Sequence, residues 1–202
     1  MNSITETTLP AIGTTMPGGF FAGVIMIEGQ RRAIIVAPKK LGELRGAWHK
    51  DEDDVPGAKF YNNGLANTQA MAEAGSKLAK QALALEIDGQ TDFYIPSQDE
   101  LEICYRALKP TPEQNWCYAR SGINLSALPP TYPYTHEFPA QTALAAFMSG
   151  GEEAFEADWY WSSTQHAGNS DYAWCQGFGN GGQSGTSKSS ELRVRAVRSQ
   201  PI

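Results

Sequence analysis

The chain has 202 residues, of which 41% are hydrophobic, enough to bury the core of one folded domain. Its formal net charge is -6 and its basic residues are scattered, whereas proteins that bind duplex nucleic acid usually present a basic face. Glycine (20) and proline (12) are both frequent, which is typical of a fold rich in loops. We therefore expect one loop-rich domain that binds no nucleic acid.

Neither a membrane span nor a secretory signal can be recognised in the sequence. The longest apolar candidate, residues 24–27, has the length of a strand. Residues 1–15 contain Glu6 and no basic residue before their first apolar stretch, unlike a secretory signal. We expect a protein that is made in a cytoplasm and inserts into no membrane.

The N-terminal part divides into a polar arm and a hairpin. Residues 1–17 are polar and rich in threonine, so we interpret them as an arm and residues 18–202 as the folded domain. Two largely apolar segments, 20–28 and 31–37, are joined at Gly29, which favours the backbone of a tight turn. This pattern predicts an antiparallel hairpin.

A helix is expected in the middle of the chain, after an irregular stretch at residues 38–66. The acidic run at 51–54 lacks the alternating ligands and central glycine of a calcium loop, so we expect a solvated acidic loop. From Asn67 to the glycine at position 89, apolar residues recur with helical spacing and predict a helix. These residues are Met71, Ala74, Leu78, Ala82 and Leu85.

A second helix has a clearer start. Ser97 and Glu100 form a capping box, in which each side chain can bond the backbone amide of the other. Its expected buried stripe is Leu101, Cys104, Tyr105 and Leu108, and Lys109-Pro110 ends it. Residues 110–139 contain six prolines and are expected to be irregular. A short helix is expected at 141–148.

The last 45 residues predict short strands at 159–163, 172–178 and 192–197, separated by turns. A hairpin, two helices and then antiparallel strands make an α+β pattern. Arginines 193, 195 and 198 are expected to form salt bridges and hydrogen bonds on the terminal strand.

Side chains alternate across the strand at 172–178. We expect its large residues to face the core, because a buried ring is worth roughly 2 kcal/mol or more; these are Tyr172, Trp174 and Phe178, with Gln176. The opposite side is expected to face solvent and holds Asp171, Ala173, Cys175 and Gly177. Trp159 and Trp161 share a face and are also assigned to the core.

No catalytic or metal-binding pattern is evident. The three cysteines, Cys104, Cys117 and Cys175, have no close spacing, and we interpret them as buried or half-buried thiols. Cys104 can pair with Cys117 if the fold brings them together. His49, His136 and His166 lack metal-ligand spacing. The acidic residues Glu152, Glu153, Glu156 and Asp158 are interpreted as a solvated face.

The chain resembles the C-type-lectin-like domain of collagen-like bacterial adhesins and of phage and prophage proteins encoded near tail genes. The resemblance covers residues 18–198 and rests on an ordered set of short motifs. Near the C-terminus these are WYWSST at 159–164, AW at 173–174 and RVRAVR at 193–198; upstream they are FFAG at 20–23, IVAPK at 35–39, ANT at 66–68 and PSQDEL at 96–101.

The resemblance implies that the first and last strands lie together, so the hairpin should share a sheet with residues 192–197. Related domains form receptor-binding tips of phage tail fibres, or variable proteins of diversity-generating retroelements. The same broad fold includes formylglycine-generating enzymes, which need two neighbouring late cysteines; here only Cys175 lies late in the chain. We therefore expect a non-enzymatic receptor-binding or adhesion protein of a virion tail, with no cofactor and no metal.

The ligand-binding surface is expected around the strand at 172–178. Its predicted residues are His166, Asn169, Ser170, Asp171, Tyr172, Cys175, Gly177, Gly179, Asn180, Ser184, Thr186, Ser189 and Ser190. The amino acids at the non-core positions of this segment can all arise from an adenine-rich AAC codon by changes in its first two bases, which is compatible with retroelement diversification. The expected partners are a bacterial surface receptor, protein or glycan, other tail proteins and further copies of the chain, as a homotrimer. The alternatives are a structural tail or baseplate component and a cysteine-dependent oxidase.

Overall fold

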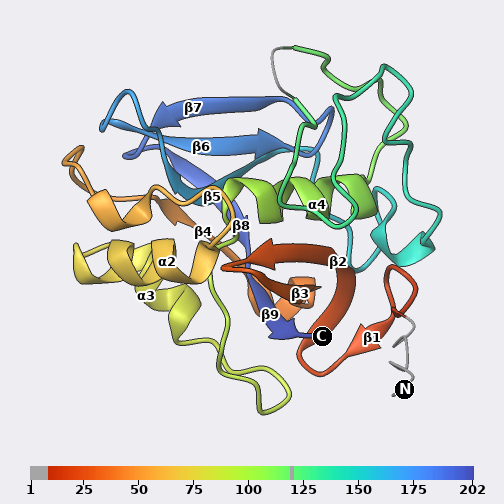
Figure 1. Cartoon of the computed structure of the whole chain (residues 1–202), viewed down its shortest axis with the longest axis horizontal. Helices are drawn as coiled ribbons and strands as arrows, with labels where there is room; N and C mark the ends of the chain where they lie inside the picture. Colours follow the sequence, from red (N-terminus) through yellow and green to blue (C-terminus); the bar gives the residue numbers. More distant parts are fainter. Residues whose placement is uncertain (1–8, 119–120) are drawn as a thin grey trace, which may run out of the picture.

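The computed structural model describes residues 9–118 and 121–202 (Figure 1). Two sheets carry the fold. The smaller has the order β1-β2-β3-β9 and the larger the order β4-β8-β5-β6-β7. Neighbouring strands are antiparallel except β5 and β8, which are parallel. This arrangement confirms the α+β class.

The smaller sheet consists of β1 (Thr15–Met16), β2 (Gly19–Ile27), β3 (Gln30–Val36) and β9 (Val197–Pro201). The larger consists of β4 (Glu43–Ala47), β8 (Glu191–Arg195), β5 (Trp159–Gln165), β6 (Tyr172–Gly177) and β7 (Gln183–Ser187). The helices are α1 (Lys39–Gly42), α2 (Gly64–Glu73), α3 (Lys77–Leu83) and α4 (Gln98–Leu108), with 3-10 turns at Pro56–Ala58 and Ala145–Phe147.

The predicted hairpin is formed by β2 and β3. Its two turn residues, Glu28 and Gly29, have φ angles of 50° and 77°, the pair of positive values that a type I′ turn requires. Within the expected arm, β1 pairs with β2, and residues 1–8 lie outside the described residues. The described part of the chain therefore contacts the hairpin before residue 18.

The C-terminal strand pairs with the hairpin as expected, but only from Val197 onward, which lies opposite Val36. The expectation of one strand at 192–197 is wrong. The chain changes sheets at the fully buried Ala196, whose amide donates to the Gly42 carbonyl and whose carbonyl accepts from the Ala37 amide. Its small side chain lets three backbone segments meet at this corner.

The helix expected from Asn67 to Leu85 is two helices, α2 and α3. Gly75 adopts a φ of 107°, which ends α2, and Ser76 then caps α3 by accepting a hydrogen bond from the Ala79 amide. The apolar spacing continued across the break because both helices pack against the same core. The helix expected at 141–148 is only the 3-10 turn Ala145–Phe147. The capping box of α4 is confirmed.

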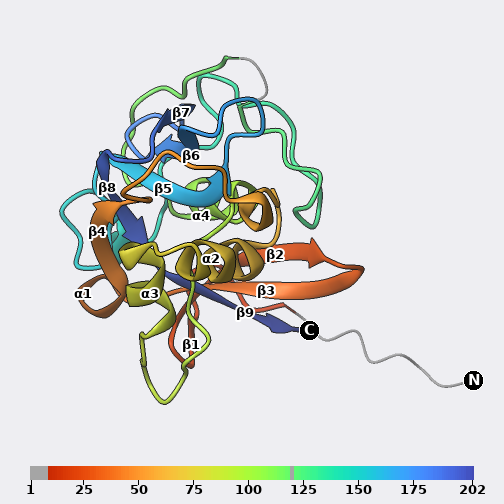
Figure 2. The ribbon, with the colours of Figure 1, turned by 90° about the vertical axis from the view of Figure 1, so that its left-hand side faces the viewer.

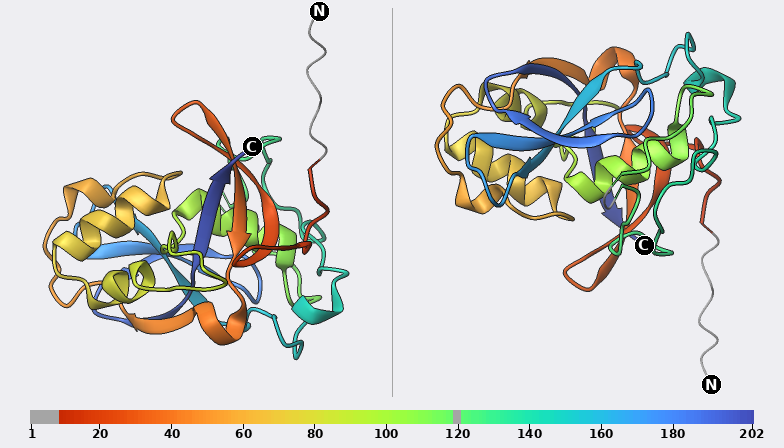
Figure 3. Two further views of the ribbon diagram at one scale, coloured as in Figure 1. Left: turned by 90° about the horizontal axis from the view of Figure 1, so that it is seen from below. Right: turned by 90° about the horizontal axis from the view of Figure 1, so that it is seen from above.

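Helices lie on both faces of the larger sheet, as Figures 1 and 2 show. Helices α2 and α3 lie against one face, where Trp48, Met71 and Trp161 form a buried cluster. Helix α4 lies between the two sheets, and Tyr105 and Phe178 belong to the cluster around it. Figure 3 shows β6 and β7 at the surface of the molecule when it is seen from above.

Replacing Trp161 by alanine is expected to lower the free energy of unfolding by about 3–5 kcal/mol. The ring is fully buried and its Nε1 donates to the Gly46 carbonyl at 3.0 Å. Trp174→Ala should cost clearly less, because the side chain is only half-buried. Urea unfolding of both variants measures the difference, and equal losses would contradict this ranking.

Candidate functional site

The two faces of β6 lie opposite to the sequence-based expectation over most of the strand. Ala173 and Cys175 are buried in the cluster beneath α2 and α3, whereas Tyr172 is 41% exposed and Trp174 is half-buried. Side-chain size misled the prediction because Trp161 already fills the space beside Ala173 and Cys175, whereas the other side of β6 is open at Tyr172 and Trp174. Phe178, just after β6, is buried as expected.

The predicted binding residues consequently differ in accessibility. Two of them, Cys175 and Gly177, are buried, so the expectation that their side of β6 is displayed is wrong. Those that are exposed are Asp171, Tyr172, Asn180, Ser184 and Ser189. Those that are half-buried are His166, Asn169, Ser170, Gly179, Thr186 and Ser190.

Accessible residues lie in patches at both ends of the β5–β6 pair. In the pairing of β5 with β6, Trp159 lies opposite Gly177 and Gln165 lies opposite Ala173. The loop at 166–171 and the turn after Gly177 are therefore at opposite ends of the same strand pair, about 20 Å apart at roughly 3.3 Å per residue. A small ligand therefore cannot contact both ends, although accessible residues of β7 such as Ser184 and Thr186 lie between them.

The first patch, which we call the hairpin face, consists of His166, Tyr172, Trp174 and Gly185. The His166 and Trp174 rings are 5.1 Å apart, and Gly185 lies opposite Trp174 in the pairing of β6 with β7. The adjoining loop is closed by its own hydrogen bonds, since the Tyr172 amide donates to Asn169 and the His166 amide donates to Tyr172. The aromatic groups are thus held on a well-bonded hairpin.

The segment at 184–190 contains a buried anchor that was not predicted. The Lys188 ammonium donates to the Asp53 carbonyl and to Gln165 Oε1, at 2.6 and 2.7 Å, and lies over the Trp48 ring. Desolvation lowers the pKa of Lys188 to about 8. The acidic loop at 51–54 is exposed, as expected, and Lys188 attaches it to the sheet.

The second patch is a cleft of about 680 Å³ at the other end of β5 and β6, which we call the Trp159 cleft. It is lined by Glu113, Gln114, Ala157, Asp158, Trp159, Gly177, Gly179 and Asn180. Three of these, Gly177, Gly179 and Asn180, belong to the predicted site. Trp159, assigned to the core from the sequence, is 39% exposed instead.

The loop before Trp116 closes one side of the cleft. The Trp116 amide donates to the Asn180 carbonyl at 2.8 Å, and the Thr111 hydroxyl donates to the Gly179 carbonyl at 2.6 Å. Trp116 itself is 57% exposed. The sequence did not predict this contact, because it joins residues more than sixty positions apart. The glycine-rich segment at 177–182 was the one signal that another part of the chain could approach there.

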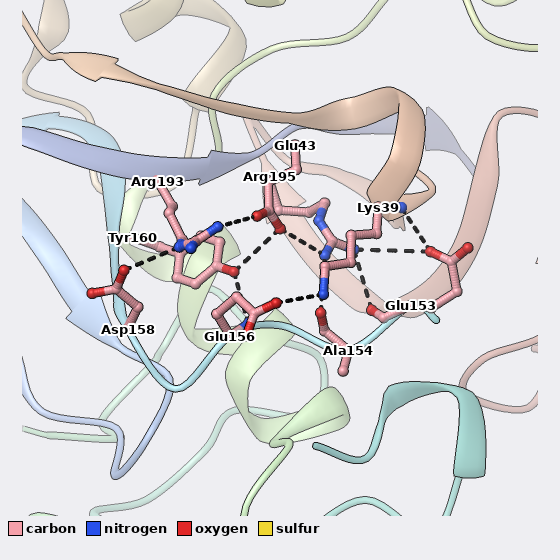
Figure 4. Close-up of polar contacts among 9 residues, drawn as sticks. All are labelled: Lys39, Glu43, Glu153, Ala154, Glu156, Asp158, Tyr160, Arg193 and Arg195. Carbon is pink, nitrogen blue, oxygen red and sulfur yellow. Dashed lines mark hydrogen bonds and ion pairs between the residues drawn. The ribbon is translucent and has the colours of Figure 1, made fainter. Parts of the chain in front are cut away.

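A network of charges holds Asp158, one of the residues that line the cleft (Figure 4). Glu43 lies between the two guanidinium groups and accepts from Arg193 at 2.6 Å and from Arg195 at 2.9 Å. Arg193 also donates to Asp158 Oδ2 at 3.0 Å. Partial burial raises the pKa of Asp158, but bonds from the Trp159 amide and Arg193 outweigh it and lower the pKa.

The charged side chains near the C-terminus form ion pairs and hydrogen bonds that attach loops to the sheets. The salt bridges of Arg193, Arg195 and Arg198 are confirmed, the last with Asp92. The expectation of a wholly solvated acidic face is wrong. Glu153 accepts from the Lys39 amide at 2.7 Å and Glu156 pairs with the Lys39 ammonium, so these carboxylates attach their loop to the sheet.

A family model described as the Lcl C-terminal domain matches residues 45–198. The chain belongs to this family. It is a family of C-type-lectin-like domains found in phage-tail and adhesin-type proteins, which confirms the resemblance read from the sequence. No curated protein matches the chain. The matched residues of this Lcl C-terminal domain include both the hairpin face and the Trp159 cleft.

The thiols of this Lcl C-terminal domain are all free. Cys104 and Cys175 are buried, whereas Cys117 is exposed, contrary to expectation. Burial raises the pKa of Cys175 to about 12, and its Sγ donates to the Ser184 carbonyl at 3.3 Å, so the thiolate is disfavoured. The described residues contain no cluster of three His, Cys, Asp or Glu side chains suited to a metal ion. None of the helices described is long and apolar enough to cross a membrane.

Arg195→Ala is expected to lower the free energy of unfolding by about 3–5 kcal/mol, because it leaves Glu43 with a half-buried, partly uncompensated charge. Arg31→Ala is the matched control, since Arg31 is exposed, and should change stability by no more than about 0.5 kcal/mol. Chemical denaturation of both variants measures the effect. A loss for Arg195→Ala as small as the control's would refute a structural role for the network.

Proposed function

We propose that this Lcl C-terminal domain is a receptor-binding or adhesion domain of phage or prophage origin that recognises a bacterial surface receptor without bond chemistry. The hairpin face carries the proposal. His166, Tyr172 and Trp174 present aromatic surface to solvent on a strand pair whose other side is packed in the core. Aromatic residues on a rigid support are the usual anchors of binding interfaces.

The residues around these rings suit a surface that changes its specificity. Asn169, Ser184 and Thr186 are at least partly accessible, and substitutions away from buried features usually shift stability by only about 0.5 kcal/mol. The more specific form of the proposal is diversification of such positions by a retroelement. Cys175 and Lys188 are buried, so they lie outside the variable set.

The proposal places the domain on a virion tail as a homotrimer that also contacts other tail proteins. Several copies on one fibre raise the strength of attachment without any new contact in a single site. Three copies of the hairpin face, each with a modest affinity for the receptor, then attach the virion to a cell.

A structural tail or baseplate component is the second candidate. A cleft of about 310 Å³ beside the first described residues supports it, because its lining is largely apolar and includes Ile12, Val24, Ile103 and Leu128. Such a surface suits a permanent protein contact. Cys175 is buried and its thiol donates to the Ser184 carbonyl. This geometry favours neither the structural role nor the cysteine-dependent oxidase.

Replacing both His166 and Tyr172 by alanine is expected to abolish attachment of the purified protein to host bacteria, with little change in melting temperature. The control is Tyr132→Ala, because Tyr132 is 81% exposed and lies away from the hairpin face. Fluorescent labelling of whole cells and thermal melts provide the two measurements. Attachment to virions but never to cells would instead favour the structural candidate.

A further inference from the structure

Strand β7 is a sheet edge without the usual protection against pairing. It is the last strand of the larger sheet, and none of the described strands or bridges lies along its outer side. Its residues, Gln183–Ser187, include no proline and no charged side chain, and their pairing with β6 has no bulge. Figure 3 shows β7 at the surface of the molecule. An edge of this kind readily accepts a further strand.

The other three sheet edges are protected. Strand β1 has only two residues, and β4 carries Glu43 and Arg45. Strand β9 ends in Pro201, and Val197 at its start already pairs with Tyr94. Short length, charged side chains and proline are the features by which proteins block strand addition. None of these features is found in β7, which distinguishes it from the other edges.

The hydrogen bonds at the two ends of β7 show which of its residues point outward. In an antiparallel pair, residues that bond the neighbouring strand alternate with residues whose amides and carbonyls point away. The Gly177 amide donates to the Gly182 carbonyl, and the Lys188 amide donates to the Asp171 carbonyl, both in the register of the β6–β7 pair. The even-numbered residues of β7 therefore bond β6, and the odd-numbered residues point outward.

The outward groups belong to Gln183, Gly185 and Ser187. In the described part of the chain, no other segment accepts a hydrogen bond from their three amides. The Ser187 carbonyl accepts from the Ser190 amide at 2.9 Å, and the Gly185 carbonyl has only a contact of 3.3 Å from the Ser184 hydroxyl. The edge thus offers three donors, together with the Gln183 and Gly185 carbonyls as acceptors.

The position of Gly185 leaves room for a side chain of an added strand on the hairpin face. Gly185 lies opposite the half-buried Trp174. A Cβ atom on Gly185 would lie 3.4 Å from the His166 ring and 3.6 Å from the Cβ atom of Tyr172, so aromatic residues border the space above the glycine. Side chains of neighbouring strands contact one another across a sheet. A large side chain placed beside Gly185 would therefore reach these rings.

The Ser187 end of β7 is acidic. The Ser187 hydroxyl donates to Glu52 at 3.0 Å, and the Lys188 amide holds Asp171 beside the same end. Both carboxylates are exposed, whereas the Lys188 ammonium is buried beneath them and bonded to the Asp53 carbonyl. Charge complementarity therefore favours a basic residue at the matching end of a partner strand.

We propose that β7 accepts an extended segment of a receptor protein as a sixth strand of the larger sheet, with a large side chain over Gly185 and a basic residue near Ser187. This inference rests on the proposed function and makes its receptor a protein. A second copy of the chain fits the edge less well. The side chains of β7 are small or polar, so two such strands would bury far less than the roughly 1,000 Å² of a stable interface. A receptor strand gains main-chain bonds and contacts with the hairpin face together.

The test uses the heptapeptide KVTYTVK, which supplies a basic end and a large central side chain, and NMR-detected hydrogen exchange on the whole chain. Binding should slow exchange of the outward amides of Gln183, Gly185 and Ser187 about tenfold or more. The amides of Ser184 and Thr186, which bond β6, should exchange slowly with or without peptide. The same peptide N-methylated at every inner residue has no inner amide to donate and should not bind.

Gln183→Pro should abolish binding of the peptide, because it removes an outward amide without breaking a bond to β6. Gln183→Ala is the matched control, since it keeps the amide, and should bind like the unchanged protein. Thermal melts check that both variants fold. The exchange measurement requires no variant, so it decides the question even if Gln183→Pro is unstable.

Three results would overturn the inference. They are equal binding of the N-methylated peptide, unchanged binding by a folded Gln183→Pro, and slow exchange of the outward amides in the free protein, which would show that a second copy already covers the edge. Treatment of host bacteria with a broad protease separates the inference from the proposed function. Loss of attachment supports a protein receptor, and attachment that survives overturns the inference alone. If the protein binds the peptide but attaches to no cell, the proposed function is contradicted instead.

Discussion

The buried contact between Arg195 and Glu43 is the constraint on which much of the molecule depends. Arg195 is almost fully buried, lies over the Phe155 ring and also donates to the Glu153 and Ala154 carbonyls. It thus joins β4, the loop at residues 153–154 and β8. A buried ion pair adds little net stability, but removing one partner is costly, so such a contact favours one arrangement over its competitors. Here it fixes β8 just before the chain crosses into the smaller sheet at Ala196.

The same network reaches one of the two surface patches. Glu43 also binds Arg193, and Arg193 holds Asp158 beside the exposed Trp159. From there β5 runs towards the other end of the sheet, where the loop after Gln165 carries the hairpin face. One rigid strand pair therefore supports a cleft at one end and an open aromatic surface at the other, and changes in one patch need not reach the other.

Local signals in the sequence predicted local structure well. The Ser97–Glu100 capping box, the Gly29 turn and the family motifs led to α4, the first hairpin and the fold class. Non-local features were out of reach. Gly75 divides a helix whose apolar spacing continues past it. The buried face of β6 could not be inferred from side-chain size, because Trp161 fills the space beside Ala173 and Cys175. The exposure of Trp159 depends on a loop, at Thr111 and Trp116, that docks on residues 179–180.

The C-terminal segment alternates between residues that can vary and residues that cannot. Cys175 packs beneath the sheet, Gln176 donates to Tyr134 and Lys188 holds the acidic loop, whereas Ser184 and Asn180 between them are exposed. Because buried anchors recur every few residues, a new specificity must arise from scattered exposed positions rather than from replacement of a whole loop. Glycines 177 and 182 form a third class. Nothing in their backbone forbids a side chain, and a Cβ atom on either would lie 3.7 Å from the Trp159 ring. Substitution at either glycine would therefore alter the surroundings of Trp159, and the exposed polar positions are the ones that can vary at little cost in stability.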